Sequence, residues 1–223
     1  MTSFKHCATF TDKLLPQARH LLGCVAELPA GARILDPFAG VGKGVDYLAD
    51  VCGYEAEGIE LEPEWAEASK RVKRGDALHL PYEDGTFDAI FTSPTYGNRM
   101  ADKDMRESVA GTYMKSLGRA ASEGSSCHMQ WGSAYRDFHW AAWAEAERVL
   151  KDPEHGEKTG YLLLNVKDHY RGKELQHVPE WHRDTIIDLG FALIEEVFIE
   201  TPGQRVGANS ELRADGEWLY LFG

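Results

Sequence analysis

The chain lacks the features that mark membrane, secreted and disulfide-rich proteins. Its longest apolar runs, at residues 161–166 and 191–199, fall far short of the roughly 18–20 residues that a membrane-spanning helix needs. The N-terminus has no apolar core of a signal peptide. No C-x-x-C pair is present, which argues against a zinc knuckle or a disulfide framework. The four cysteines are Cys7, Cys24, Cys52 and Cys127. We therefore expect a protein of the reducing cytoplasm with no membrane partner.

Positive charge is also scarce. Lys and Arg number 24 against 36 Asp and Glu, which gives a formal net charge of -12. A protein that grips nucleic acid over its whole surface needs an excess of cations, so any nucleic-acid site here has to be local. The 9 histidines show no metal-ligand spacing, and we predict no metal site.

The predicted elements alternate between strands and helices. With 223 residues, the chain has the length of one generous domain, which we place at residues 1–223 with an inserted segment at about 98–133. Hydrophobic periodicity fades in that segment. Helices are expected at 12–28, 43–51, 64–72, 141–150 and 180–189. Strands are expected at 33–36, 54–60, 74–77, 89–92, 161–166, 191–199 and 218–222.

This alternation predicts an α/β fold with a mostly parallel sheet, because parallel crossovers need a helix-length connection. The last two strands are expected to close the sheet as a C-terminal antiparallel pair. Ligands of such sheets bind beyond the carboxyl ends of the strands. Polar or glycine-rich clusters follow three of these ends, at residues 36–44, 60–62 and 93–98, and they predict where the site lies.

The first cluster reads Asp-Pro-Phe-Ala-Gly-Val-Gly-Lys-Gly from Asp36. When the dinucleotide pattern G-x-G-x-x-G is laid on Gly40 and Gly42, Val45 stands where it requires glycine. The Walker pattern fails too, because Lys43 is followed by glycine in place of Ser or Thr. What remains is a tight turn whose glycines let the backbone approach a ligand closely.

Acids follow the next two strands. Glu60 stands 24 positions after Asp36, where doubly wound folds place a carboxylate that accepts the ribose hydroxyls of a nucleotide. Asp76 lies at the end of the third predicted strand, where its carboxylate could accept a hydrogen bond from the exocyclic amine of an adenine. These residues predict an adenosine-type ligand.

Two motifs together resemble a known family. Asp36–Gly42 and, after the fourth strand, Thr92–Arg99 look like the D-P-F-x-G-x-G and [DNS]-P-P-[YFW] motifs of the S-adenosylmethionine-dependent DNA amino-methyltransferases, in the same order. The resemblance covers about residues 9–166. It implies a Rossmann-like class I methyltransferase fold, S-adenosyl-L-methionine as the cofactor and DNA as the partner. The serine form of the second motif implies methylation of cytosine N4 in preference to adenine N6.

The resemblance also implies roles for individual residues. Ser93 and the Pro94 carbonyl would accept the N–H groups of a target amine, whose delocalised lone pair otherwise attacks poorly. Tyr96 would stack on a base rotated out of the duplex. Thr95 stands where the family has its second proline, so this loop keeps a backbone N–H and more freedom. With the acids above, the predicted cofactor-binding residues are Phe10, Thr11, Asp36, Phe38, Gly40, Gly42, Glu60 and Asp76.

The inserted segment carries the remaining predicted substrate contacts. It holds five basic residues against four acids in a strongly acidic chain. With Thr95, the predicted substrate-binding residues are Asn98, Arg99, Lys115 and Arg119. Two alternatives remain: an RNA or small-molecule amino-methyltransferase, which the net charge favours, and a catalytically silent S-adenosylmethionine-binding subunit, which Thr95 suggests. The sequence carries no signal of oligomeric state.

Overall fold

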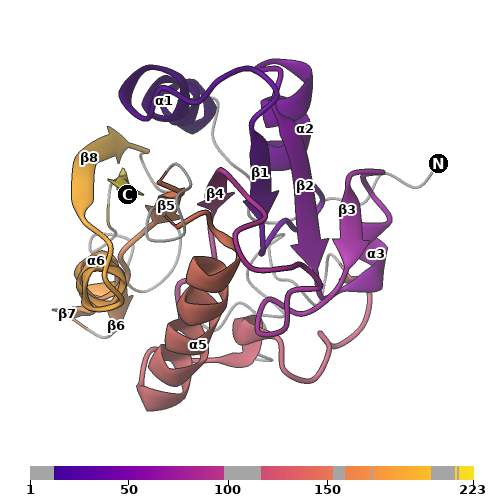
Figure 1. Cartoon of the computed structure of the whole chain (residues 1–223). Helices are drawn as coiled ribbons and strands as arrows, with labels where there is room; N and C mark the ends of the chain where they lie inside the picture. Colours follow the sequence, from indigo (N-terminus) through magenta and orange to yellow (C-terminus); the bar gives the residue numbers. More distant parts are fainter. Residues whose placement is uncertain (1–12, 98–116, 153–158, 172, 202–213, 215) are drawn as a thin grey trace.

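A seven-stranded sheet forms the centre of the protein (Figure 1). The computed structural model describes residues 13–97, 117–152, 159–171, 173–201, 214 and 216–223. The strand order is β3-β2-β1-β4-β5-β9-β8. Neighbours from β3 to β5 run parallel, whereas β9 runs antiparallel to both β5 and β8. The predicted mostly parallel sheet with a C-terminal antiparallel strand pair is therefore confirmed.

The central strands are short and almost wholly buried. They are rich in branched and aromatic residues, as is typical of strands that are covered on both faces. The parallel strands are β1 (Arg33–Asp36), β2 (Glu55–Glu60), β3 (Val72–Arg74), β4 (Ala89–Thr92) and β5 (Tyr161–Val166). The antiparallel strands are β8 (Leu193–Glu200) and β9 (Gly216–Phe222), and a separate small hairpin pairs β6 (Tyr170–Arg171) with β7 (Glu174–Leu175).

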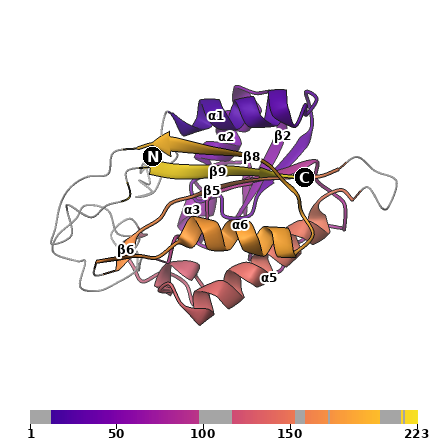
Figure 2. The same cartoon turned by 90° about the vertical axis from the view of Figure 1, so that its left-hand side faces the viewer.

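Helices cover both faces of the sheet, so the molecule has three layers (Figure 2). One face carries α1 (Leu14–His20), which continues into a π-helical turn (Leu21–Val25), and α2 (Lys43–Asp50). The other face carries α5 (Ser133–Val149) and α6 (Val178–Asp188). Each face has its own apolar cluster, the first packed around α1 and α2 and the second around α5 and α6. The shorter elements are α3 (Pro63–Ala66) and a 3-10 turn (Ser126–His128).

The observed bounds differ from the predicted ones in two instructive places. The helix expected at 64–72 is the single turn α3, because the chain must return to pair Val72 with Gly58 on β2. The helix expected at 141–150 begins earlier, at Ser133, because Tyr135 and His139 extend its buried face toward the N-terminus. The segment predicted as an insertion, at about 98–133, therefore leads directly into the long helix α5.

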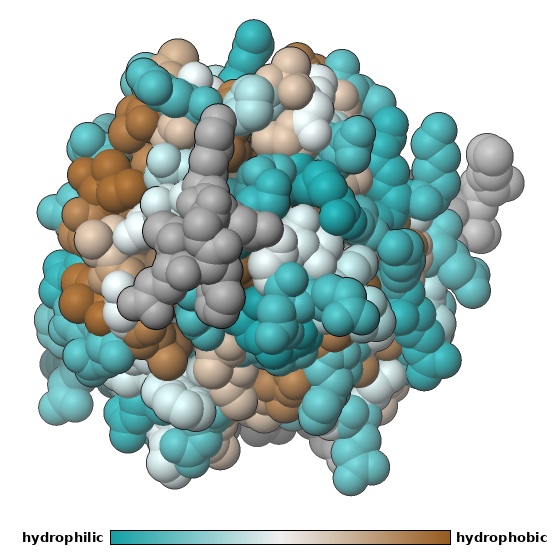
Figure 3. Space-filling view, viewed as in Figure 1, coloured by the Kyte–Doolittle hydropathy of each residue, from teal (hydrophilic) through white to brown (hydrophobic). Residues whose placement is uncertain are grey.

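Apolar side chains reach the surface along the edge strand β8. Ile194 and Phe198 are 44% and 49% exposed, and two glutamates between them keep this sheet edge charged. In the view of Figure 3, apolar residues gather on the side where Figure 1 shows β8. Within the described ranges, no helix is long and apolar enough to cross a membrane.

Candidate functional site

The three predicted clusters meet at one edge of the sheet. β1 pairs in parallel with β2 on one side and with β4 on the other, so the carboxyl ends of all three strands point the same way. Asp36 ends β1, Glu60 ends β2, and Ser93 follows β4. This is the edge at which open α/β sheets bind their ligands.

Asp36 is buried between the ends of β1 and β4. Its Oδ1 accepts a hydrogen bond from the Thr92 hydroxyl at 2.6 Å and another from the Phe38 backbone N–H at 3.0 Å. Burial raises the pKa of Asp36 to about 7, although both hydrogen bonds act to lower it. The carboxyl therefore holds the start of the glycine loop against β4.

Glu60 holds the same loop from the other side. Its Oε2 accepts from the Gly40 N–H and its Oε1 from the Glu62 N–H, both at 2.8 Å. Burial raises the pKa of Glu60 to about 7, opposed by these two hydrogen bonds and assisted by the nearby carboxyls of Glu62 and Asp36. A carboxylate has about four acceptor positions, so about two remain for the hydroxyls of a ligand.

The glycine loop leaves no room for a side chain at Gly42. Gly42 has a φ of +79°, in the left-handed region, and a Cβ there would meet Ser69 Cβ at 2.6 Å. Gly40 also has a positive φ, of 53°. The loop is therefore pressed against the chain that leads from α3 to β3.

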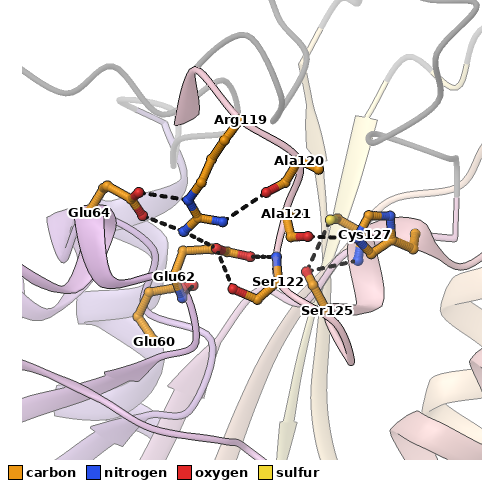
Figure 4. Close-up of polar contacts among 10 residues, drawn as sticks. Glu60, Glu62, Glu64, Arg119, Ala120, Ala121, Ser122, Ser125 and Cys127 are labelled. Atoms are coloured by element: carbon orange, nitrogen blue, oxygen red, sulfur yellow. Dashed lines mark hydrogen bonds and ion pairs between the residues drawn. The ribbon is translucent and has the colours of Figure 1, made fainter.

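Glu62, which sequence reasoning placed in a cluster without a role, is the most buried acid of the site at 1% exposure. It accepts from Ser122 N at 2.7 Å, Ser122 Oγ at 2.9 Å and Arg119 Nη2 at 2.7 Å (Figure 4). Arg119 also donates to both oxygens of Glu64. The two carboxylates raise the pKa of the guanidinium above its usual value.

These contacts fasten residues 119–128, which we term the strap, over the end of β2. Ala121 and Cys127 of the strap form an apolar cluster with Trp65 of α3, and Val41 of the glycine loop packs against it. Cys127 is 2% exposed. Arg119 was predicted to contact the phosphates of DNA. In the structure it pairs with two carboxylates beside the glycine loop.

We expect Arg119→Ala to loosen the strap, because Glu62 and Glu64 both lose their guanidinium partner. Labelling of the Cys127 thiol should then accelerate by about tenfold, the factor that corresponds to roughly 1.4 kcal/mol of easier opening. The measurement uses a thiol reagent on protein whose other three cysteines are serine. An unchanged labelling rate would show that the apolar contacts alone hold the strap.

The loop after β4 forms a second polar group. Ser93 Oγ lies 2.8 Å from the Tyr96 hydroxyl and donates to Asn165 Oδ1 of β5 at 3.0 Å. The Tyr96 hydroxyl is also 3.3 Å from that oxygen, and Asn165 Nδ2 donates to the Trp218 carbonyl of β9. The Tyr96 ring packs against the apolar cluster on the α5 and α6 face. Sequence reasoning missed Asn165, although a lone polar residue in the buried run Tyr161–Val166 was a usable signal.

The remaining predicted residues divide into two groups. Thr95 donates from Oγ1 to Ser126 Oγ at 2.8 Å, and its carbonyl accepts from the Tyr135 hydroxyl. Asp76 lies in the turn after β3, where its Oδ1 accepts from Leu78 N and its side chain is 46% exposed. Pro94 is buried between Ser93 and Thr95. The residues that lie outside the described ranges are Phe10, Thr11, Asn98, Arg99 and Lys115.

A third polar cluster lies at the start of α6. Ligand atoms of Asp168, His177 and Glu180 all lie within 4.8 Å of one another. Asp168 Oδ1 accepts from the N–H groups of His169 and Val178, the second of which opens α6. His177 Nδ1 contacts Glu180 Oε1 at 3.3 Å. These bonds tie the helix start to the chain that follows β5, and histidine spacing in the sequence gave no sign of the grouping.

Comparison with known proteins agrees with this geometry. Residues 35–104, which include the glycine loop, β2 and the loop after β4, match the family described as methyltransferase domain. The chain has the Rossmann-like fold of the methyltransferases, and its residues 35–104 match that domain family. S-adenosylmethionine is its methyl donor, and the free acceptor positions of Glu60 beside a glycine loop without side-chain space fit that donor.

Individual relatives of the methyltransferase domain cover different shares of the chain. Norajmaline N-methyltransferase of Rauvolfia serpentina is 35% identical over 71 residues, which are 26% of this chain and 24% of that protein. TrmN from Thermus thermophilus has a TM-score of 0.56 at 17% identity over 99% of this chain and 50% of that one. A SAM-dependent methyltransferase from Methanosarcina mazei has a TM-score of 0.54 at 13% identity over 89% of this chain and 94% of that one. At these identities the two structures show the fold alone, and none of the three relatives is named as a DNA amino-methyltransferase.

Donor binding by the methyltransferase domain should depend on pH. Asp36 and Glu60 both have a pKa raised to about 7, and an ionised carboxylate is the stronger acceptor of ribose hydroxyls. Binding should therefore strengthen as the pH rises from about 6 to about 8, by up to about tenfold for one controlling group. Calorimetry with S-adenosylhomocysteine measures this, and Glu60→Gln should flatten the profile. Affinity that falls as pH rises would contradict it.

Proposed function

We propose that the protein transfers the methyl group of S-adenosylmethionine to an amine nitrogen held at Ser93–Tyr96. The observation that carries the proposal is the hydrogen-bonded group of Ser93, Tyr96 and Asn165 at the ends of β4 and β5. Whichever hydroxyl donates in the Ser93–Tyr96 pair, Ser93 Oγ accepts at most one hydrogen bond within this group, so at least one of its two lone pairs remains. That lone pair suits an amine N–H.

The chain's own residues would orient and activate the amine. When bound, S-adenosylmethionine supplies a methyl group that its sulfonium already activates. Ser93, by accepting an N–H, draws the nitrogen lone pair out of conjugation and toward tetrahedral geometry. Asn165 fixes Ser93 and, being 1% exposed, keeps the acceptor in one orientation. The remaining contribution is positioning at near-attack distance.

A small molecule is the acceptor that we favour. The net charge of -12 supports it, and so does Arg119, whose charge is shared between Glu62 and Glu64 and is not free for a phosphate. An aromatic ring carrying the amine would suit a site that is bordered by Tyr96 and by the aromatic residues of the α5 face. The name of the relative from Rauvolfia serpentina agrees with an N-methyltransferase of this kind.

A second candidate is the exocyclic amine of a DNA base, cytosine N4 in preference to adenine N6. The order Asp36-Pro37-Phe38 and then Ser93-Pro94-Thr95-Tyr96 favours it, since these motifs lie at neighbouring strand ends. Its phosphate contacts would have to come from Arg99 and Lys115, which lie outside the described residues. RNA would use the same contacts.

One experiment separates these acceptors. The protein is incubated with donor labelled in the methyl group and, in separate reactions, with duplex DNA, single-stranded DNA, RNA, free nucleosides and a set of aromatic amines, and the labelled product is identified by mass. We expect label on a free amine. Label found only in DNA supports the second candidate, and donor binding without label on any acceptor supports a catalytically silent subunit.

A further inference from the structure

A buried hydrogen-bonded chain on the α5 and α6 face has no part in the site described so far. Tyr135, His139 and Trp143 follow one another at four-residue spacing on α5 and are each 0% exposed. His182 of α6 is also 0% exposed and lies among them. Polar groups buried to this degree are costly unless they are fully paired.

The direction of each hydrogen bond follows from what each group can do. Trp143 Nε1 can only donate, so His182 Nδ1, at 3.0 Å, accepts. The Thr95 carbonyl can only accept, so the Tyr135 hydroxyl, 2.6 Å away, donates its single proton to that carbonyl. His182 Nε2, at 2.8 Å from that hydroxyl, must then donate to it. The chain therefore runs from Trp143 through His182 and Tyr135 to Thr95.

This order fixes His182 in one form. It is neutral, with its proton on Nε2, because a proton on Nδ1 would face the Trp143 N–H. Burial lowers the pKa of His182 well below its usual value, and the neighbouring His139 adds to this effect. The chain is thus a set of oriented donors with no charge, and every donor in it points toward the Thr95 carbonyl.

Thr95 belongs to the loop that would hold the target amine, and the same loop is held at two further points. Thr95 Oγ1 donates to Ser126, and the Gly97 carbonyl accepts from Trp131 N at 2.8 Å. Gly97 has a φ of +67°, and a Cβ there would lie 2.9 Å from Trp131 N. The loop therefore packs closely against the chain that leads into α5.

We propose that Tyr135 is a positioning residue for methyl transfer, which orients the Ser93–Tyr96 loop through the Thr95 carbonyl, with His182 and Trp143 fixing its hydroxyl. The chain would supply the rigidity that a second proline gives in the motif S-P-P-Y. This role for Tyr135 rests on the proposed function, in which the Ser93–Tyr96 loop holds the amine. Tyr135 itself touches neither donor nor acceptor in this assignment.

Tyr135→Phe tests the proposal, because it keeps the ring and removes only the hydroxyl. The turnover number should fall by about tenfold with the acceptor that the labelled-donor experiment identifies. This is the size of effect expected when buried groups lose a hydrogen bond. The affinity for S-adenosylhomocysteine should stay within about twofold. Hydrogen exchange of the Trp131 amide, which reports on its bond to Gly97, should accelerate by a similar factor.

Tyr82→Phe is the matched control. Its hydroxyl is likewise hydrogen-bonded, to Glu57 at 2.9 Å, and its ring packs against the apolar cluster on the α5 and α6 face, but its hydroxyl bonds to β2 and not to the Ser93–Tyr96 loop. We expect this variant to match the wild type in turnover and in Trp131 exchange. An equal change in the two variants would mean that loss of any such hydroxyl loosens the fold, and it would overturn the proposal.

A double-mutant cycle with Thr95→Pro separates positioning from general stability. If Tyr135 acts by restraining residue 95, its hydroxyl should matter little once proline stiffens that residue, so Tyr135→Phe should cost less than about twofold in the Thr95→Pro background. The same tenfold loss in both backgrounds would overturn the proposal. Thr95→Val controls for the lost contact with Ser126.

Two further measurements, on His182 variants and on the Trp131 amide, test the proposal even if no methylated acceptor is found. His182→Gln can still donate to Tyr135 and should retain more turnover than His182→Leu, and equal losses count against the chain. If no acceptor is methylated, the proposed function fails, but the exchange of the Trp131 amide still decides whether Tyr135 restrains the loop. Exchange equal to wild type in Tyr135→Phe would overturn the inference whatever the acceptor.

Discussion

Replacing Glu60 with alanine is expected to remove most of the affinity for the methyl donor. The variant loses the acceptor for the ribose hydroxyls and also the bond that fixes the Gly40 N–H, so the loop and the ligand lose a partner together. Hydrogen bonds to a charged group contribute roughly 1.5–3 kcal/mol each, so a loss of about 3 kcal/mol, or roughly a hundredfold in affinity, is expected. Calorimetry with S-adenosylhomocysteine measures it.

Glu57→Ala is the control for that experiment. Glu57 lies on the same strand, but it pairs with Lys73 and Tyr82 away from the strand end. Its loss should leave donor affinity within about twofold of wild type, because exposed ion pairs of this kind contribute little. Equal effects of the two variants, or wild-type affinity in a folded Glu60→Ala protein, would refute the donor site.

Replacing Ser93 with alanine should have the largest effect on catalysis. The change removes the acceptor for the amine N–H and leaves the Tyr96 hydroxyl and Asn165 Oδ1 with only each other as partners. Deleting one preorganised hydrogen-bonding group that acts in the transition state typically costs about a hundredfold or more in turnover, and we expect a loss of about a hundredfold. Single-turnover kinetics with saturating donor measure it.

Donor affinity provides the internal control for Ser93→Ala. Within the described residues, the hydrogen-bond partners of Ser93 are Tyr96 and Asn165 and not Asp36, Gly40 or Glu60, so binding of S-adenosylhomocysteine should be unchanged within about twofold. A parallel loss of donor affinity would mean that Ser93 supports the fold of the whole edge. Turnover equal to wild type would place the acceptor of the amine elsewhere.

The meeting of Asp36, Glu60 and the glycine turn at one edge of the sheet could be predicted because the geometry that brings them together is nearly local. Asp36 and Glu60 each end a strand, and strands that pair in parallel bring their carboxyl ends to one edge whatever the side chains between them. A glycine turn after the first strand then has to lie beside the acid after the second. The same argument located Ser93 at the end of β4.

The contacts that link remote segments could not be predicted from the sequence. Tyr135 meets Thr95 across 40 positions, and Ser122 meets Glu62 across 60, and no periodicity in the sequence pairs such residues. The ion pairs of Arg119, which was predicted to contact the substrate, with Glu62 and Glu64 were also not predicted from the sequence. Charge counted along a segment does not show which charges are already neutralised in the fold.

The strap borders both halves of the site within a few residues. Ser122 bonds Glu62 on the donor side, and Ser126, four positions on, bonds Thr95 on the acceptor side. A ligand that stiffens or displaces this stretch from one side therefore alters the free energy of binding on the other. Linkage makes the coupling reciprocal: whatever factor the donor imposes on acceptor affinity, the acceptor imposes on the donor. Order of substrate addition would then be a property of these few hydrogen bonds.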